Sequence, residues 1–537
     1  MKALDSRLKP KESNHNSLTE DYYQNVSKFP EKLGITQKDL GAFYTDKEVV
    51  TYVLRLLEIK EGTTILDPAC GCGSFLFPLY DMAILSGKPS LLDIYGVDID
   101  ERAVSFTRNA LKSIIGGQSE KISETNVLLG DFVFNNLALE SSTQGAGRFN
   151  EVRNKGGFDY IIGNPPYNVK DVTKKKVTLS KDIHRTLAEG SKNMPIYFIL
   201  RGLELLKDNG VIAFVLPKSL LYVKKYDAFR KYLLRNFVIT RIAEIGMKFR
   251  NVRGEQVIIF IKKSKPANGS SIEFVSLHKY SNNSNEIPFS VTQEYFLDKP
   301  SIPIFSDPDV FSVIRHITSN SEKLSNFVEY KVFRGLPLHI KKIIEGSPQI
   351  SKISDNSCVR GKDVTKGNLK RICLFDLKTK EIPKADKLKK PKIIMQNIYS
   401  SESGIISYLD EIGIITTETV TNVFMENHKK LKFFYALLNS KLINFYLFNV
   451  IFAQSKLTMH MDGHYIEQIP IVWNEDSEES RKIMGIVDQI QNAKESELKG
   501  LFSRLDTLVY ELFGLNVHMT KVVENTMSTV LSKRSKW

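Results

Sequence analysis

Short apolar runs alternate with longer amphipathic stretches over residues 40–265. Runs rich in Val, Ile, Phe and Tyr predict strands, and apolar positions three or four residues apart predict helices. Asn209-Gly210 predicts a turn before one of the strands. The alternation predicts a doubly wound, Rossmann-like α/β domain. The predicted strands span residues 64–66, 94–97, 160–162, 211–215 and 257–261, and the helices 75–86, 103–113, 194–207 and 226–236.

The pattern changes after Lys262. Residues 262–271 have the Pro, Gly and Ser content of a linker or exposed hairpin. Irregular short strands follow, and apolar helices are predicted at residues 431–448 and in the last sixty residues. We expect a mixed α+β second domain with a helical tail. The predicted division is an N-terminal arm (1–38), an α/β domain (39–299), the second domain (300–475) and the tail (476–537).

Basic residues exceed acidic ones in this 537-residue chain, 75 against 61, for a formal net charge of +14. Such a balance favours a polyanionic partner, nucleic acid first and an acidic membrane surface second. We find no run of about 18 apolar residues, no signal-peptide pattern and no lipidation motif. The expectation is a cytoplasmic protein without membrane association.

Cysteine and histidine positions give little indication of a metal site. The four cysteines show neither a disulfide framework nor zinc spacing. His460 and His464 are four residues apart, but Asp462 and Gly463 between them favour a turn. We therefore predict no metal.

A glycine-bearing turn, Asp-Pro-Ala-Cys-Gly-Cys-Gly at residues 67–73, follows the first predicted strand. Glycines there let a ligand approach the backbone closely. Asp98 ends the next strand, where a carboxylate can bind both ribose hydroxyls. A nicotinamide dinucleotide is the alternative ligand, although Phe75-Leu76 occupy the place of that fingerprint's third glycine.

The most specific string is Asn-Pro-Pro-Tyr at residues 164–167, directly after an apolar run. The exocyclic nitrogen of adenine is a poor nucleophile, because its lone pair is delocalised into the ring. Two acceptors aimed at its hydrogens draw it toward tetrahedral geometry and stabilise the developing positive charge. The Asn164 side-chain oxygen and the Pro165 carbonyl are the candidate acceptors, and Tyr167 offers a ring for stacking a purine.

A surface turn after a buried strand is the alternative interpretation of this string, since Asn-Pro commonly starts turns. The strand, the aromatic residue and the preceding cofactor turn favour the functional one. Methylation at C5 of a pyrimidine would require a cysteine after a proline, and the chain contains no Pro-Cys.

Together these strings resemble the gamma-class amino-methyltransferases of restriction-modification systems, the TaqI-like adenine-N6 DNA methyltransferases. The resemblance implies S-adenosylmethionine as cofactor, double-stranded DNA as substrate and a target-recognition domain after the catalytic domain. Residues 41–50 are similar to motif X, with Tyr44 and Thr45 beside the methionine end of the cofactor. Asp46 stands where the family has proline, a departure expected to loosen the loop.

The same resemblance assigns the remaining cofactor contacts, among them Asp131 and Phe132. The alternative interpretation is that Asp131 caps a turn and that Phe132 is a residue of the hydrophobic core. Residues 244–252 are similar to motif VIII, which makes Phe249 the ring that sandwiches the flipped adenine opposite Tyr167. The expected cofactor contacts are Tyr44, Thr45, Asp67, Ala69, Gly71, Gly73, Asp98, Ile99, Asp131 and Phe132.

Lysines follow the Asn-Pro-Pro-Tyr string closely, and a basic segment there suits phosphate contacts beside the flipped base. A solvated charged loop is the alternative. The lysines of residues 384–392 are a second candidate, and residues 437–441 and 460–470 resemble the end of target-recognition domains. The candidate DNA contacts are Lys170, Lys174, Lys175 and Lys176.

The predicted function is site-specific N6-adenine methylation with base flipping, in a restriction-modification system with a cognate endonuclease or as an orphan enzyme. Alternatives are a protein-glutamine or RNA methyltransferase, a fused nuclease using Asp309 and residues 329–331, and a DNA-binding subunit without activity. The target sequence, the base-reading residues and the oligomeric state stay open.

Overall fold

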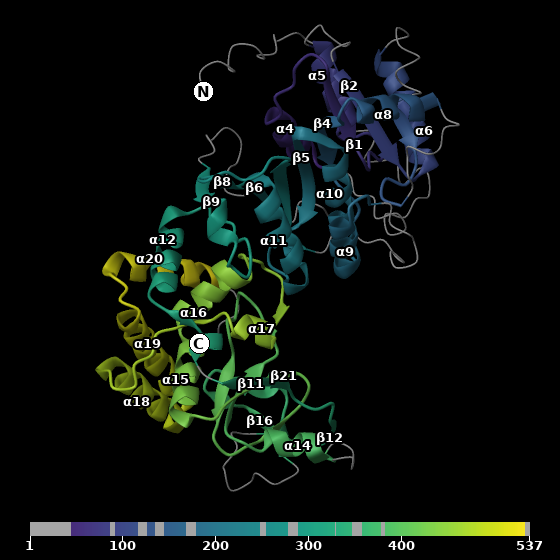
Figure 1. Ribbon diagram of the computed structural model, residues 1–537. Coiled ribbons are helices and arrows are strands. Elements are labelled where there is room, and N and C mark those ends of the chain that lie inside the picture. Colours follow the sequence, from purple (N-terminus) through teal and green to yellow (C-terminus); the bar gives the residue numbers. More distant parts are fainter. Residues whose placement is uncertain are drawn as a thin grey trace. The chain divides into compact units, whose positions relative to one another are not determined.

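The computed structural model describes residues 45–85, 92–115, 126–134, 144–167, 179–246, 254–277, 288–327, 329–345, 357–376 and 382–531. The chain divides into two compact units, Met1–Lys299 and Pro300–Trp537. Figure 1 shows a long sheet flanked by helices in the first unit, and smaller sheets and a group of helices in the second.

The first unit is built on a nine-stranded sheet of order β3-β2-β1-β4-β5-β7-β6-β8-β9. Strands β3, β2, β1, β4 and β5 are parallel, and β7 is antiparallel to β5 and β6. The strands are β1 Thr63–Asp67, β2 Leu92–Asp98, β3 Val127–Leu129, β4 Phe158–Gly163, β5 Leu206–Pro217, β6 Val238–Gly246, β7 Gln256–Lys262, β8 Ser271–Ser276 and β9 Phe289–Thr292.

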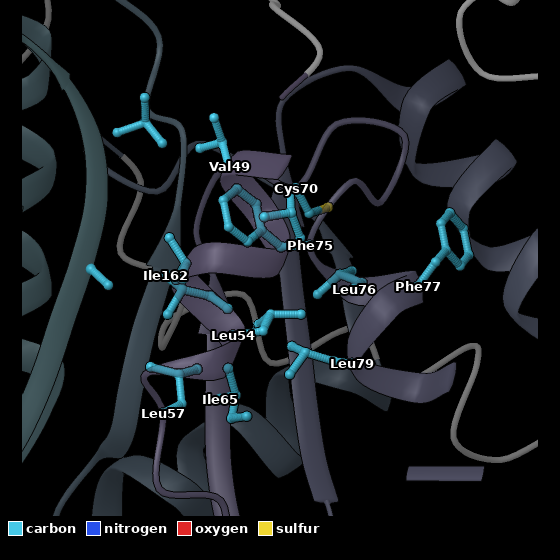
Figure 2. Close-up of a cluster of buried hydrophobic side chains, with 14 of the residues drawn as sticks. Val49, Leu54, Leu57, Ile65, Cys70, Phe75, Leu76, Phe77, Leu79 and Ile162 are labelled. Carbon is cyan, nitrogen blue, oxygen red and sulfur yellow. The ribbon is translucent and has the colours of Figure 1, made fainter. Parts of the chain in front are cut away.

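Both faces of the sheet are covered by helices, as the near-continuous apolar strands require. Helices α4, α5 and α6 pack on one face in a single apolar cluster that includes Ile65 and Ile162 (Figure 2). Tyr95, Phe149 and Phe158 make aromatic contacts between α8 and the sheet. The helices are α4 Lys47–Arg55, α5 Leu76–Leu85, α6 Glu101–Ile115, α8 Gln144–Asn154, α9 Asp182–Ser191, α10 Met194–Leu205 and α11 Asp227–Asn236.

The strand order reverses at β1, which pairs with β2 on one side and β4 on the other. In open α/β sheets, ligands bind beyond the carboxyl ends of the strands at such a switch point. The bounds of the strands and helices confirm the five predicted strands and four predicted helices of this unit. The switch point indicates the edge of the sheet at which we expect the functional site.

One local prediction needs correction. Residues 262–271 connect β7 to β8, and the same sheet continues through β9, so this connection lies inside the α/β domain. Asn209-Gly210, predicted as a turn before the strand, lies within β5, where Asn209 adopts a φ of +66° at an irregularity in the pairing with β4. The turn-forming pair thus marks an irregularity inside a strand.

The second unit contains two four-stranded sheets of order β11-β21-β17-β19 and β12-β16-β13-β20. Three two-residue pairings, β10 with β23, β14 with β15 and β18 with β22, complete the strands of its described part. The bounds are β10 Glu322–Lys323, β11 Tyr330–Arg334, β12 His339–Glu345, β13 Ser357–Val359, β14 Val364–Thr365, β15 Asn368–Leu369, β16 Arg371–Asp376, β17 Lys392–Gln396, β18 Ile398–Tyr399, β19 Ser407–Asp410, β20 Ile415–Thr416, β21 Val420–Met425, β22 Met459–His460 and β23 Pro470–Ile471.

Most helices of the second unit pack against one another, and a few contact the sheets. The single helix predicted at residues 431–448 is broken at Ser440, which has extended φ and ψ and accepts a hydrogen bond from Ile443 N–H to begin α16. The apolar pattern continues through this break, so the pattern alone does not show it. The helices are α12 Pro308–Ser319, α13 Leu324–Phe327, α14 Ile382–Leu388, α15 His428–Asn439, α16 Lys441–Tyr446, α17 Gly463–Ile466, α18 Glu478–Asn492, α19 Glu495–Leu512 and α20 Val517–Leu531.

Candidate functional site

Asp67 ends β1 at the switch point and is 2% exposed. Its Oδ1 accepts a hydrogen bond from Ala69 N–H at 3.1 Å. Burial, with a smaller contribution from the neighbouring Asp98, raises the pKa of Asp67 to about 8, although this hydrogen bond lowers it. A cationic ligand group beside Asp67 would favour the ionised form of its carboxyl group. The ammonium group of a methionine moiety is a ligand group of this kind.

The glycine turn is tied to the end of β2. Gly71 N–H donates to Asp98 Oδ2 at 2.7 Å, and Asp98 Oδ1 accepts from Asp100 N–H at 2.9 Å. Burial raises the pKa of Asp98, although these backbone donors favour its ionised form. Gly71 and Gly73 have φ of +50° and +87°, and a Cβ on Gly73 would lie 2.4 Å from the Phe77 ring. The turn thus requires glycine at Gly73, where a side chain has no room, and the positive φ favours it at Gly71.

Two further side chains belong to this turn. Thr107 on α6 is fully buried and donates its hydroxyl to Gly71 O at 2.8 Å. Ile99, just after Asp98, is 58% exposed, unlike the buried residues of β2. Thr107 was missed in the sequence because a hydroxyl inside an amphipathic helix has no special pattern.

Asp131 and Phe132 follow β3. Asp131 Oδ1 accepts hydrogen bonds from the N–H groups of Val133 and Phe134, both at 3.1 Å. Phe132 is 2% exposed and lies 5.3 Å from the ring of Phe198. Such contacts are expected if Asp131 caps a turn and Phe132 is a core residue, which was the alternative interpretation. Binding of the cofactor by these two residues stays a prediction.

Thr45 and Asp46 precede α4, and Thr45 is buried. Asp46 Oδ1 accepts from Glu48 N–H at 2.8 Å, and Asp46 has a φ of −57°. This φ is the one that proline would have, and the carboxylate caps the helix. The capping hydrogen bond thus constrains Asp46 where the family has a proline ring, and the expected loosening of the loop stays a prediction.

The Asn-Pro-Pro-Tyr string begins at the end of β4, beside β1. Gly163 has a φ of +154°, and a Cβ there would lie 2.6 Å from Asp67 Oδ1. Asn164 follows, and its Oδ1 is buried without a hydrogen-bond partner among the residues that the structure describes. Pro165 is buried, and the Tyr167 hydroxyl lies 3.5 Å from the Val215 carbonyl oxygen. Burial raises the pKa of Tyr167.

A buried acceptor without a partner is costly, and a bound ligand can supply the missing donor. The structure thus places Asn164 and Asp67 together at the switch point. Asp98 lies on the neighbouring strand β2.

Several predicted site residues lie outside the described residues. They are Tyr44, Phe249, Lys170, Lys174, Lys175 and Lys176. Of the second basic candidate, Lys392 is fully buried and forms an ion pair with Asp410, so its proposed phosphate contact is wrong. Lys384 and Lys390 in the same stretch are exposed.

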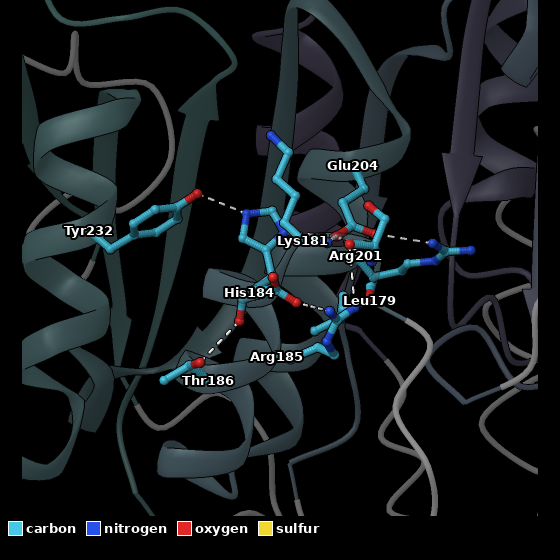
Figure 3. A network of polar contacts seen from close by, with 10 residues as sticks. Leu179, Lys181, His184, Arg185, Thr186, Arg201, Glu204 and Tyr232 are labelled. Carbon is cyan, nitrogen blue, oxygen red and sulfur yellow. Dashed lines mark hydrogen bonds and ion pairs between the residues drawn. The ribbon is translucent and has the colours of Figure 1, made fainter.

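A polar network joins residues 180 and 181 to side chains of α9, α10 and α11 (Figure 3). Glu204 Oε1 accepts from His184 Nδ1 at 2.9 Å and from the N–H groups of Ser180 and Lys181 at 2.9 and 3.2 Å. Burial raises the pKa of Glu204, but the bonds from His184 and the two amides outweigh it and hold it at about 2. His184 Nε2 lies 2.8 Å from the Tyr232 hydroxyl. Sequence offered no signal for these long-range partners.

Comparison with known proteins agrees with this geometry. Residues 14–294 match the family model described as N-6 DNA Methylase. The chain belongs to the N-6 DNA methylase family. Residues 356–471 match the TaqI-like C-terminal specificity domain. The chain is an adenine-specific DNA methyltransferase of the kind found in restriction-modification systems, as its motifs predict, and family membership implies use of S-adenosylmethionine.

Individual relatives of this N-6 DNA methylase are distant. Type II methyltransferase M.VspI of a Vibrio species is 27% identical over 348 residues, 64% of this chain and 69% of that protein. The type I MpnII methylase subunit of Mycoplasma pneumoniae is 27% identical over 42% of this chain, but the match covers only 41% of that subunit.

Solved structures share the fold. The type IIL restriction-modification enzyme MmeI, in complex with DNA, aligns with a TM-score of 0.50 at 14% identity over 96% of this chain and 78% of MmeI. A DrdV-DNA complex gives a TM-score of 0.52 at 12% identity over 88% of this chain and 59% of DrdV. Within the described part of the chain, no helix is long and apolar enough to cross a membrane.

Proposed function

We propose that the methylase transfers the methyl group of S-adenosylmethionine to N6 of an adenine flipped out of double-stranded DNA. The observation that carries the assignment to residues is the buried, unpartnered Oδ1 of Asn164 in the described part of the chain. An amino group of the substrate would donate to this oxygen. The remaining roles are assigned around it.

Asn164 Oδ1 and the Pro165 carbonyl accept hydrogen bonds from the two hydrogens of the adenine amino group. They thereby direct the nitrogen lone pair away from the ring and stabilise its positive charge as the new bond forms. Tyr167 stacks on the extruded base, and Phe249 is assigned to the opposite ring face. The fixed prolines keep both acceptors in place before the base arrives.

The residues at the switch point suit S-adenosylmethionine, which supplies the electrophilic methyl when bound. We assign the methionine ammonium to Asp67 and the ribose hydroxyls to Asp98. A Cβ added to Gly71 would meet nothing within 4 Å, so the turn leaves space for a ligand, and exposed Ile99 offers apolar surface for an adenine ring. Thr45, Ala69, Gly73, Asp131 and Phe132 complete the proposed cofactor contacts, with Tyr44.

DNA recognition is assigned to the second unit, with residues 300–475 as the reading domain. The match of residues 356–471 to a specificity domain supports this assignment. Lys170, Lys174, Lys175 and Lys176 contact phosphates near the flipped base. The methylase modifies the site of a cognate restriction endonuclease or acts alone in a prokaryotic cytoplasm.

Transfer of radiolabelled methyl groups to matched DNA, RNA and protein substrates tests this function. Incorporation into double-stranded DNA, recovered as N6-methyladenine, is the expected result. Preferential labelling of RNA or of a glutamine amide would contradict it. Sequencing of DNA from expressing cells then identifies the target site.

A further inference from the structure

Strands β18 and β22 of the second unit form a two-stranded antiparallel ribbon with one exposed face. Ile398 of β18 lies directly opposite His460 of β22, and both residues are exposed. At 52%, Ile398 is among the most exposed large apolar residues of the described chain. The neighbouring pair, Tyr399 and Met459, is turned inward, and Tyr399 is 1% exposed. The ribbon thus presents a pair of unlike side chains to solvent.

The residues that lead into β22 extend this exposed face. Residues 456–458 directly precede the strand and are all exposed, with Leu457 at 39%. A second cation lies close by, because Arg334 at the end of β11 forms an ion pair with Asp462, just after β22. We call the exposed set the ribbon surface, and it consists of Ile398, Lys456, Leu457, Thr458 and His460.

Buried aromatic side chains support the ribbon from inside the unit. Phe452 is fully buried, and its ring stacks on that of Tyr399 with centroids 4.7 Å apart. The ring of Tyr465 lies 5.1 Å from the same Phe452. In addition, Met461 N–H donates to the Asn397 carbonyl at 2.8 Å, which continues the pairing of the two strands. A surface with such support keeps its shape before a partner binds, and this lowers the cost of binding.

The chain reaches the ribbon through an unusual backbone turn. Ala453 and Gln454 have φ of +48° and +58°, a conformation that residues other than glycine seldom adopt. The buried side chain of Ser455 then accepts a hydrogen bond from Leu457 N–H at 3.2 Å. Strained backbone of this kind persists where the surrounding structure fixes it, and it is frequent at ligand-binding sites. The turn therefore sets the course of residues 456–458 along the surface.

The chemistry of the ribbon surface suits the major groove of DNA, which is wide enough for a two-stranded β-ribbon. Base edges in that groove present hydrogen-bond donors and acceptors, with which the His460 imidazole and the Thr458 hydroxyl can pair. They also present the thymine methyl group, which an apolar side chain can contact, and the ammonium group of Lys456 suits a phosphate. Both strands lie within residues 356–471, the part of the chain that matches a specificity domain. These features favour DNA as the occupant.

We propose that the ribbon surface enters the major groove of the target DNA and reads part of its sequence. The inference rests on the proposed function, which assigns DNA recognition to the second unit. Ile398 and Leu457 contact apolar groups such as a thymine methyl. Thr458 and His460 form hydrogen bonds with base edges, and Lys456 binds a phosphate.

The test uses the full chain and two fluorescent duplexes of equal length, one with the methylated site found by sequencing and one without it. Fluorescence anisotropy measures the affinity for each duplex at several salt concentrations. The variants are Ile398→Ala/His460→Ala, which removes the exposed pair, and Lys456→Ala. Ile412→Ala is the matched control, because Ile412 is 47% exposed but lies near the start of β17, whereas Ile398 follows its end.

We expect the double variant to lose about tenfold or more in affinity for the target duplex and to stay within about twofold of wild type on the other duplex. Lys456→Ala should weaken binding to both duplexes alike and reduce the slope of log affinity against log salt concentration by about 1. Ile412→Ala should leave both affinities unchanged. The variants should keep the wild-type melting temperature, because the altered side chains are exposed.

Wild-type discrimination between the two duplexes in the double variant would overturn the inference. So would equal losses on both duplexes, which indicate phosphate contacts alone. A lowered melting temperature with unchanged discrimination would also overturn it, since the surface would then pack against another part of the chain.

Wild-type protein that transfers no methyl group to DNA contradicts the proposed function itself, and the inference with it. A wild type that methylates a defined site, together with an unaffected double variant, contradicts the inference alone.

Discussion

Replacement of Gly163 by alanine perturbs the proposed cofactor-binding and catalytic residues at one point. Gly163 has a φ of +154°, and the new Cβ would lie 2.6 Å from Asp67 Oδ1 and 3.3 Å from Asp67 Cγ. A non-glycine residue in this backbone region costs about 1–3 kcal/mol. Either Asp67 must move or the backbone before Asn164 must turn, so binding and chemistry should both suffer.

If that strain falls on the site, it corresponds to a loss of roughly 5- to 150-fold in kcat/KM, because about 1.4 kcal/mol is a factor of ten. Steady-state methylation of DNA and calorimetric titration with S-adenosylmethionine measure the two effects. Gly500→Ala in α19 is the control, since its Cβ would meet nothing within 4 Å and helix propensity favours alanine. A Gly163→Ala enzyme with wild-type kcat/KM and cofactor affinity would refute the reasoning.

Two further outcomes follow from buried groups. Asp67 has a pKa of about 8 in the folded chain against an ordinary 3.8, so folding favours its protonated form. The free energy of unfolding should therefore fall from about pH 4 to pH 8 more steeply in wild type than in Asp67→Asn. Urea titrations across this pH range that give the same change of free energy with pH in both proteins would contradict this. Val523 on α20 is fully buried and Val517 is 74% exposed. Val523→Ala should destabilise the chain by about 2 kcal/mol in denaturant titrations and Val517→Ala by less than about 0.5 kcal/mol, and equal effects would show that α20 does not pack as described.

The central strands were predictable because their apolar runs are local and continuous. Residues 64–66 and 160–162 lie within β1 and β4, and the glycine turn follows β1 as predicted. The edge of the sheet was not predictable in the same way. Strand β8 pairs in parallel with β6, although β7 lies between them in sequence, and the turn-rich residues 262–271 give no sign of this nonlocal pairing.

Asn164 and Asp67 could be named as candidate site residues from the sequence because each belongs to a short contiguous string at a strand end. The two residues lie near each other because β1 and β4 are neighbours at the switch point. Gly163 permits the close approach, since a side chain there would clash with Asp67. Residues whose partners are distant in sequence could not be found. Lys218 contacts glutamates 26 and 37 residues away, and nothing in its own neighbourhood distinguishes it from a surface lysine.

The most direct test of the catalytic assignment is Asn164→Ala in a single-turnover methylation assay. Loss of one acceptor that acts in the transition state should lower the rate by about 100-fold or more, by analogy with removal of one oxyanion-hole donor. Affinity for S-adenosylmethionine should stay within twofold, and DNA binding should persist. A methylation rate equal to that of wild type would contradict the account.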